Sequence, residues 1–371
     1  MADFQSTYKL KTNPFRLTPA NEPSELVWAG FKDVKEKFAR RVERSVRIPN
    51  STLVLNWGEY GSGKTHAARY FNKKDVLLAI ANKAGKSIPY STIISLPKGK
   101  EPVYSIYVAI IDKLNIEKLR EDFGQHTQQL ITHIESIGSN IHIQNVLKAI
   151  FNTEVPHLEI KKYLYGNASV AELRTLNELG ILRPVKDDTD YTSILAGLFS
   201  CLTFQKEVYS CVIIWIDEFE DIAVLNNSNI DKTNNFIREI LDNVPDNLLL
   251  FLNLTQSALI SAEDLGQYVY DSVRSRIKER ISFDLPSPQI FKEYLKELLT
   301  LFRNDAEEID PYFPFNETVI TTLIQEQGNV SLRQFNESLS LLLELSDMDE
   351  KCPIDMDVFN NYKSEIIWHK D

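Results

Sequence analysis

Cysteine and long apolar runs are both scarce in this sequence, and each shortage excludes a class of protein. The chain has 3 cysteines in 371 residues, Cys201, Cys211 and Cys352, and they show no paired spacing. We therefore expect reduced thiols in a core rather than a disulfide framework or a thiolate metal site. No apolar run approaches the roughly 20 residues that cross a bilayer, and the first residues lack the regions of a signal peptide. These features predict a cytoplasmic protein with no membrane contact.

Basic residues are also in deficit. The chain carries 41 lysines and arginines against 52 acidic residues, which gives a net charge of -11 at pH 7. A protein that grips nucleic acid by its phosphates gathers lysine and arginine on one face. Any contact with duplex DNA must therefore use a confined basic stripe or a partner protein.

What the sequence does contain is a regular alternation of short apolar runs with amphipathic stretches. Such alternation is typical of an α/β protein, in which helices flank a parallel sheet. An apolar run at 211–216 is the pattern of a central strand that is covered on both faces. The expected strands are 52–57, 91–95, 211–216, 248–254 and 280–285, and the expected helices among them are 63–71, 103–113 and 231–243.

Three regions are expected along the chain. The first is an N-terminal segment, 1–50, and the second is a P-loop core, 51–285, which contains a helical insertion at about 117–190. After residue 286 only helical periodicity remains, which predicts an all-helical lid domain, 286–371. Within the insertion and the lid, the expected helices are 129–137, 144–151, 170–179, one that begins at Ser287-Pro288, 318–327 and 332–345.

A glycine-rich loop is the strongest chemical signal. It fits the pattern G-x-x-x-x-G-K-[ST], follows an apolar strand and opens a helix, which is the setting that this phosphate-binding motif requires. Its amides and the helix N-terminus attract phosphate, while Lys64 is expected to reach the outer phosphates and Thr65 to bind magnesium. The predicted nucleotide-binding residues are Gly58, Glu59, Tyr60, Gly61, Ser62, Gly63, Lys64, Thr65 and His66.

Two carboxylates follow the apolar run Val212 to Ile216. Asp217 suits the magnesium shell, because this ion prefers oxygen ligands, and Glu218 suits polarising the water that attacks the terminal phosphate. Neighbouring side chains of a strand point apart, so both acids can serve only if the strand ends at Asp217 and the chain turns there. The alternative for either acid is an ordinary helix cap.

Polar residues near the end of a second apolar run are candidates for holding the attacking water. Asn253 and Thr255 share one face by the period of two along a strand. If this strand lies beside the one that ends in Asp217, one of the two side chains can reach the water. The alternative is a polar residue whose hydrogen bonds are satisfied locally.

Arginines form two further signals. Arg274, Arg276 and Arg280 lie in a basic run, where one of them can stabilise phosphate charge on a neighbouring subunit, face solvent, or contact nucleic acid. Arg333 lies in a first helical turn, because Ser331 and Gln334 form a capping box. The helix dipole disfavours a cation there, which favours a use such as binding the nucleotide phosphates from the lid over an incidental surface position.

Taken together, these residues resemble an AAA+ ATPase of the branch that holds origin-recognition subunits and transposon target-selector ATPases. The resemblance implies that Asn253 or Thr255 is the first sensor, Arg274 or Arg276 the arginine finger and Arg333 the second sensor. Asn13-Pro14-Phe15 and Trp28-Ala29-Gly30-Phe31 resemble the segment that wraps the adenine, which implies a nucleotide contact for Phe15. Three stretches, 163–166, 176–181 and 215–220, are similar, more loosely, to ATP-binding proteins of bacterial phage-exclusion systems.

The resemblance implies an ATP- and magnesium-dependent homo-oligomer with nucleotide at the subunit interface, acting on DNA or on an effector protein. Our leading hypothesis is an ATPase switch for a DNA-directed machine in phage defence or another mobile-element conflict. Transposon target selection or DNA loading is one alternative, and an assembly module that binds ATP with little hydrolysis is another. A P-loop kinase for a small metabolite is a third, which the helical lid and Arg333 disfavour.

Overall fold

The computed structural model describes residues 4–16, 25–137, 140–256, 260–261, 263–303 and 310–367. The chain divides into two compact units, each built from separate stretches of sequence. The sheet unit consists of Phe38–Trp57 and Lys74–Ile281, and the lid unit consists of Met1–Lys37, Gly58–Lys73 and Ser282–Asp371. The phosphate loop therefore packs with the helical lid, although the strand before it belongs almost wholly to the sheet unit.

Five strands among the described residues form one sheet in the order β2-β3-β4-β1-β5. Strands β2, β3 and β4 are parallel, with Val212 of β3 opposite Tyr90 of β2 and Leu248 of β4. β3 is buried along its whole length because it has a strand on each side and helices over both faces. The predicted parallel sheet is confirmed. The strands are β1 (Thr52–Gly58), β2 (Tyr90–Ser95), β3 (Val212–Asp217), β4 (Leu248–Thr255) and β5 (Ile277–Phe283).

The last strand was predicted at 280–285, but β5 runs over Ile277–Phe283. Its residues alternate between partly buried and exposed from Ile277 to Arg280, which is the pattern of an edge strand. The charged residues in this stretch hide the alternation, so the prediction began at the later, more apolar part. Arg280 consequently lies within the strand rather than at its start.

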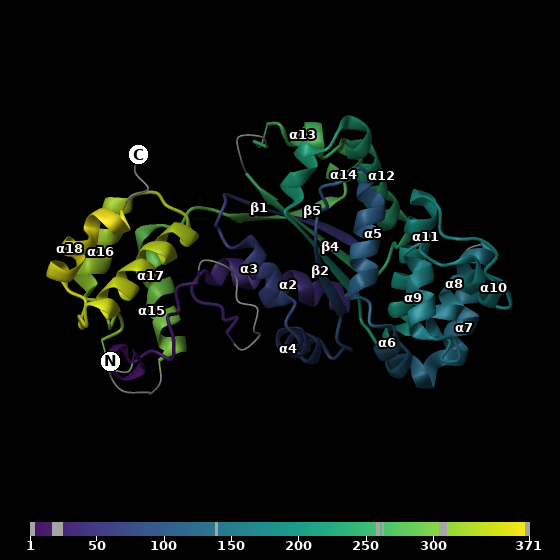
Figure 1. The fold of residues 1–371 in the computed structure, drawn as a ribbon, viewed down its shortest axis with the longest axis horizontal. Coiled ribbons are helices and arrows are strands. Elements are labelled where there is room, and N and C mark those ends of the chain that lie inside the picture. The colour runs from purple at the N-terminus through teal and green to yellow at the C-terminus, as the bar shows by residue number, and fades with distance from the viewer. Residues whose placement is uncertain are drawn as a thin grey trace. The chain divides into compact units, whose positions relative to one another are not determined.

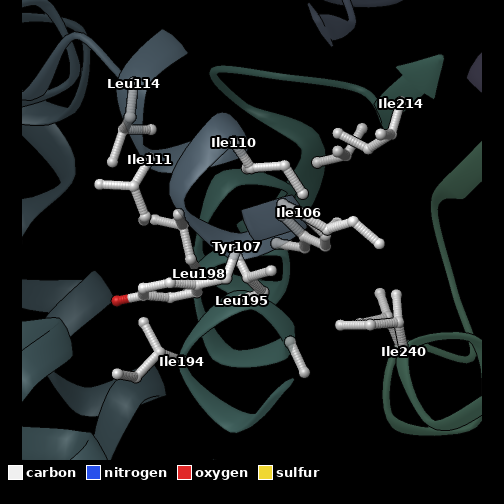
Figure 2. Close-up of a cluster of buried hydrophobic side chains, with 14 of the residues drawn as sticks. Ile106, Tyr107, Ile110, Ile111, Leu114, Ile194, Leu195, Leu198, Ile214 and Ile240 are labelled. Atoms are coloured by element: carbon white, nitrogen blue, oxygen red, sulfur yellow. The ribbon is translucent and has the colours of Figure 1, made fainter. Parts of the chain in front are cut away.

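The two faces of the sheet are covered by different helices. On one face, Ile106 and Ile110 of α5 (Pro102–Lys113) lie beside Ile214 of β3 and Ile240 of α12 (Asn227–Asn243) (Figures 1 and 2). The neighbouring side chain on β3, Trp215, points the other way because successive strand residues alternate between faces. There it stacks on Phe251 of β4, with ring centroids 3.8 Å apart, and both rings contact Phe38 of α2 (Lys32–Arg47).

The insertion is a helical bundle. The predicted helices are confirmed with small shifts as α7 (Thr127–Ser136), α8 (Ile141–Phe151) and α10 (Val170–Asn177). Two short helices, α6 (Ile116–Phe123) and α9 (His157–Leu164), were not predicted. Arg120 of α6 donates to the carbonyls of Ala149, Ile150 and Val155 over 3.1, 2.8 and 2.6 Å. It thereby satisfies two carbonyl groups in the last turn of α8, those of Ala149 and Ile150, which have no helical partners.

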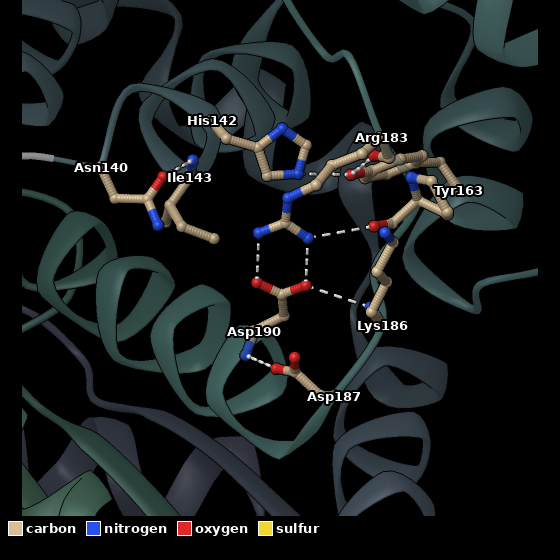
Figure 3. Close-up of polar contacts among 9 residues, drawn as sticks. Asn140, His142, Ile143, Tyr163, Arg183, Lys186, Asp187 and Asp190 are labelled. Atoms are coloured by element: carbon tan, nitrogen blue, oxygen red, sulfur yellow. Dashed lines mark hydrogen bonds and ion pairs between the residues drawn. The ribbon is translucent and has the colours of Figure 1, made fainter.

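A polar cluster joins the insertion to α11 (Asp188–Leu202), a further helix that was not predicted (Figure 3). Arg183 donates to both carboxylate oxygens of Asp190, and the backbone N–H of Lys186 adds a third bond of 3.1 Å. The Arg183 side chain lowers the pKa of Asp190 below its ordinary value. Tyr163 donates from its hydroxyl to the Arg183 carbonyl over 2.9 Å, and His142 Nε2 lies 3.0 Å from the same hydroxyl.

The described part of the C-terminal region is helical, as predicted. Ser287 caps α15 with Pro288 in the first turn, and Ser331 and Gln334 form the predicted capping box of α17. The helices are α15 (Pro288–Phe302), α16 (Glu317–Gln327), α17 (Leu332–Met348) and α18 (Met356–Ile366). The remaining helices are α1 (Phe4–Tyr8), α3 (Lys64–Phe71), α4 (Lys74–Ala84), α13 (Leu265–Tyr268) and α14 (Asp271–Arg274), with short 3-10 turns at Gly124–His126, Phe204–Lys206 and Phe219–Val224.

Other expectations concern cysteine and membranes. Cys201, Cys211 and Cys352 are unpaired, and the first two are buried, as predicted. Burial raises the pKa of both buried thiols, so they stay protonated. None of the helices that the structure describes is long and apolar enough to cross a bilayer.

Candidate nucleotide-binding site

The phosphate loop has the backbone that its sequence predicts. Gly61 and Gly63 have φ values of 74° and 103°, in the left-handed region where a side chain is strained. Gly63 is the N-cap of α3, so the helix begins at Lys64 with its first N–H groups at the loop. A loop that turns into a helix N-terminus in this way is a site for anions.

Lys64 is drawn into the loop that precedes it. Its ammonium group donates to the carbonyls of Gly58 and Glu59 over 2.9 and 2.8 Å and to the Ser62 hydroxyl over 3.2 Å. The side chain is buried, with 6% exposed. These hydrogen bonds hold the ammonium group inside the loop, at the start of a helix, where a cationic side chain attracts phosphate. Thr65 follows as the second residue of α3 and is partly exposed.

In the sheet unit, three buried polar side chains form a chain of hydrogen bonds across neighbouring strands. Asn56 of β1 donates to Asn253 Oδ1 over 2.6 Å, and Asn253 Nδ2 donates to Asp217 Oδ1 over 2.9 Å. Asp217 and Asn253 lie at the ends of β3 and β4, and both are buried. The structure thus brings together two of the predicted site residues and adds Asn56, which sequence reasoning missed.

The strand ends at Asp217, and the chain turns at the next residue. Glu218 has φ 54° and ψ 38°, a left-handed conformation that costs an ordinary residue about 1–2 kcal/mol. Its side chain is exposed, whereas that of Asp217 is buried. The condition under which both acids can serve, a strand that ends at Asp217 and then turns, is therefore met.

Asn253 and Thr255 have different surroundings. The backbone N–H of Thr255 donates to Glu220 Oε2 over 2.9 Å, and the Thr255 side chain is only partly buried. Of the two candidates, Asn253 is the one that bonds to Asp217. Glu220 thus accepts a hydrogen bond from the backbone of β4, and its neighbour Asp221 forms an ion pair with Lys98 over 3.1 Å.

Arg333 lies against the phosphate loop within the lid unit. Its backbone N–H donates to the Gly61 carbonyl over 3.2 Å, and its Nη1 donates to the Tyr60 hydroxyl over 2.5 Å. The guanidinium carbon lies 5.1 Å from the centre of the Tyr60 ring, which is cation–π geometry. An arginine from the first turn of α17 and the phosphate loop are thus in direct contact.

The arginines of the basic run are paired within the chain. Arg276 donates to the Asp242 carboxylate from Nε and Nη2, over 2.7 to 2.9 Å. Arg274 pairs with Asp271, which is 91% exposed. Arg280 lies over the ring of Trp57, with its guanidinium carbon 4.8 Å from the centroid. The structure does not bring these arginines into one cluster with a common partner.

The N-terminal segment contacts α3 through Val27 and Trp28, and its Phe15 lies in the lid core. Phe15 is 2% exposed and packs on Phe315 in the lid core, with ring centroids 5.8 Å apart. His66 Nε2 lies 2.8 Å from the Val27 carbonyl, so this nitrogen carries the proton and donates. Burial lowers the pKa of His66. Trp28 packs against His66 and against Tyr70.

The residue that sequence reasoning missed, Asn56, has no local signature. Asn56 sits inside an apolar strand, and its polarity at a buried position was the one available signal. Tyr60 was predicted as a loop residue, but its contact with Arg333 was not, because the motif specifies no side chain at this variable position. Its exposed ring carries no periodic signal.

No protein-family model matches the chain, and no curated protein sequence matches it. Solved structures do match. The ORC1 protein of Aeropyrum pernix in complex with DNA is 13% identical, covers 95% of this chain and 69% of its own, and has a TM-score of 0.52. Drosophila ORC bound to DNA is 12% identical, with coverages of 99% and 68% and a TM-score of 0.53. The ADP form of the Aeropyrum pernix ORC2 protein is 13% identical, with coverages of 89% and 67% and a TM-score of 0.51.

At this level of identity the likeness concerns the fold. The match spans the sheet, the helices on its faces and the helical C-terminal region. The predicted fold class, a parallel sheet flanked by helices with a C-terminal helical lid, is confirmed, and the chain shares the fold of these ORC structures.

Proposed function

We propose that this protein is a magnesium-dependent ATPase that works as an oligomeric, nucleotide-controlled switch for a DNA-directed machine. The observation that carries the proposal is the buried Lys64 ammonium group, held by the carbonyls of Gly58 and Glu59 inside a loop of left-handed glycines. A positive charge enclosed by inward-facing backbone in front of a helix N-terminus has the chemistry of a triphosphate site.

Asp217 and Thr65 are the residues that would hold magnesium. Both offer oxygen, which this ion prefers, and the Asp217 carboxylate is buried with an amide of Asn253 as its hydrogen-bond partner. A buried carboxylate whose hydrogen-bond partner is a neutral amide is suited to binding a cation, because the amide does not cancel its charge. Magnesium, when bound, neutralises charge that develops on the phosphate oxygens.

The residues at the ends of β3 and β4 are also suited to hydrolysis of ATP. Glu218 accepts a proton from a water molecule as its oxygen attacks the terminal phosphorus, and the bond to the bridging oxygen of ADP breaks. Asn253, held by Asn56 and Asp217, is suited to orienting that water.

The oligomeric part of the proposal rests on arginine. One member of the basic run, Arg274 or Arg276, supplies charge to the nucleotide of a neighbouring subunit, and Arg333 supplies it from the lid. The ion pair of Arg274 with Asp271 is exposed to water, where such pairs contribute at most about 1 kcal/mol. It can therefore be given up for a phosphate at little cost.

The DNA part of the proposal comes from the fold. Two of the ORC structures that match are complexes with DNA. The net charge of -11 means that this chain would contact a duplex through a limited surface or through an effector protein. Phage defence is the setting that we propose, on the similarity of 163–166, 176–181 and 215–220 to phage-exclusion proteins.

The test combines turnover with particle mass. We expect the purified protein to release phosphate from ATP only with magnesium, and to form larger particles with ATP and magnesium than without them. Adding duplex DNA tells whether DNA joins the particle. ATP binding without turnover leaves an assembly module, a phosphorylated small acceptor indicates a kinase, and absence of ATP binding overturns the proposal.

A further inference from the structure

We infer that Tyr60 is a positioning residue that holds Arg333 over the phosphate loop, ready to bind the terminal phosphate of ATP. The inference rests on the proposed function, since it concerns the same nucleotide. It adds a role for a loop residue that the phosphate-loop pattern leaves unspecified.

Two adjacent loop residues, Tyr60 and Gly61, contact Arg333, one at its side chain and the other at its backbone. The Gly61 carbonyl accepts the Arg333 N–H over 3.2 Å, which sets the start of α17. The Tyr60 hydroxyl accepts from Nη1 over 2.5 Å, and the Tyr60 ring lies 5.1 Å under the guanidinium carbon. One contact orients the backbone and the other orients the charged group, so the side chain has little freedom left.

The first turn of α17 packs so closely on the phosphate loop that there is no room for a side chain at Gly61. A β-carbon added at Gly61 would lie 2.7 Å from Arg333 Cβ and 3.0 Å from Ser331 Oγ. The N-terminus of α17 therefore adjoins the loop that opens α3. Two helix N-termini and the side chains of Lys64 and Arg333 together make this part of the lid unit strongly attractive to an anion.

The side-chain partner of the Arg333 guanidinium, Tyr60, is uncharged. Some other arginines of the chain are paired with carboxylates, as Arg183 is with Asp190 and Arg276 with Asp242. For Arg333, the polar partner of the guanidinium among the described residues is a neutral hydroxyl. A hydroxyl and a ring face hold the group in place without cancelling its charge, whereas a carboxylate would compete with phosphate for it.

The geometry also permits simultaneous contacts. A guanidinium carries five N–H donors in a planar fork, and the bond to Tyr60 uses one of the two terminal nitrogens. The rest of the fork can donate to a phosphate oxygen while Tyr60 stays in place. We expect this contact to distinguish ATP from ADP, because it is directed at the phosphate that ADP lacks.

The experiment is a double-mutant cycle on nucleotide affinity. Calorimetry with magnesium measures ATP and ADP binding to the full chain, to Tyr60→Phe, to Arg333→Ala and to the double variant. Tyr60→Phe should weaken ATP binding by about 2- to 10-fold, the value of one hydrogen bond, and leave ADP binding unchanged. In the Arg333→Ala background, Tyr60→Phe should have no further effect, because the residue it positions is gone.

Two further variants complete the experiment: one tests the aromatic ring of Tyr60, and the other is a control for the loss of a tyrosine hydroxyl elsewhere. Tyr60→Leu removes the ring as well and should weaken ATP binding more than Tyr60→Phe does. Tyr270→Phe removes a hydroxyl that bonds to Asp231 on the surface of the sheet unit, and it should leave both affinities unchanged. Thermal unfolding of each variant shows that it is folded; Tyr60 is 67% exposed, so little core is lost.

The outcomes separate the two proposals. If the unmodified protein binds ATP but Tyr60→Phe binds it equally well, the inference fails and the proposed function stands. An equal loss from Tyr60→Phe with and without Arg333 also overturns the inference, because the tyrosine then acts by itself. If the unmodified protein binds no ATP, the proposed function fails and the inference fails with it.

Discussion

The backbone N–H of Arg333 donates to the carbonyl of Gly61 over 3.2 Å, so the first turn of a lid helix is bonded to the phosphate loop itself. The two residues are far apart in the sequence, and neither belongs to the strand that precedes the loop. Because the phosphate loop packs on α17, a substitution in the loop should also alter the packing of that helix.

Gly61→Ala should disturb both the loop and the lid. The residue has φ 74°, and the new β-carbon would meet Arg333 Cβ at 2.7 Å. We expect a loss of about 1–3 kcal/mol in unfolding free energy and at least a tenfold loss of ATP affinity. Thermal unfolding and calorimetry measure the two.

A matched control is Gly124→Ala. Gly124 has φ -50° and nothing within 4 Å of an added β-carbon, so this change should be neutral. Equal behaviour of the two variants would contradict the close approach at Gly61.

Lys64→Ala should abolish useful ATP binding. The ammonium group makes three hydrogen bonds within the loop, to Gly58, Glu59 and Ser62. Losing a buried charge that faces phosphate should weaken ATP binding by about 100-fold or more. Equilibrium binding of a fluorescent ATP analogue measures it, with the exposed Lys74→Ala as control. Unchanged binding by Lys64→Ala would remove the proposed site.

Glu218→Gln should separate binding from hydrolysis. The amide keeps the size of the side chain but cannot accept the proton of water, so turnover should fall by about 100-fold or more while ATP still binds. Phosphate release measures turnover, and the exposed Glu121→Gln is the control. Turnover close to that of the unmodified protein would exclude Glu218 as the base.

Glu218→Gly tests the strain at the same position. Glycine accepts φ 54° at no steric cost, so this variant should lose turnover without losing thermal stability. Differential scanning fluorimetry measures the stability. A clear drop in melting temperature would show that the carboxylate stabilises the fold and would argue against a site kept for chemistry.

Arg274 and Arg276 can be distinguished by mixing subunits. Arg276 is tied to Asp242 by bonds of 2.7 to 2.9 Å, whereas the partner of Arg274 is almost fully exposed. We therefore expect Arg274→Gln to reduce turnover by about tenfold or more and Arg276→Gln to act less strongly.

If Arg274 works across an interface, adding inactive Lys64→Ala subunits should restore turnover to Arg274→Gln. The Lys64→Ala subunit still provides the arginine, and its neighbour provides an intact ATP site. Mixing with the double variant, Lys64→Ala and Arg274→Gln, should restore nothing. Absence of rescue in the first mixture would argue against a shared site.

Asp190→Asn should destabilise the insertion in a pH-dependent manner. Arg183 lowers the pKa of Asp190 in the folded protein, so its stabilising contribution is present above the unfolded value of about 3.8 and is lost as pH falls through the folded value. We expect a loss of about 1–3 kcal/mol at pH 7 that shrinks below pH ~4. Denaturant unfolding from pH 3 to 8 measures it, with the exposed Asp246→Asn as control. A pH-independent difference would contradict the ion pair.

Much of the fold was predictable because its signals are local. A strand buried on both faces must be an apolar run, and β3 could be recognised for that reason. The capping box of Ser331 and Gln334 and the glycines of the phosphate loop are likewise set by neighbours in the chain. The edge strand β5 was placed too late, because its charged residues obscure the period of two. The helix α11 was missed, because its nearly continuous apolar residues obscure the helical period.

The amino-acid sequence by itself determined the parallel sheet, the helical lid and the identity of the phosphate loop, because each depends on residues within a few positions of one another. Only the tertiary structure decided that Asn253 rather than Thr255 bonds to Asp217, that Asn56 completes that chain, and that Tyr60 holds Arg333. These contacts join residues 36, 197 and 273 positions apart. Hydrogen bonds of that kind depend on which strands and helices become neighbours, and no local pattern of side chains specifies that.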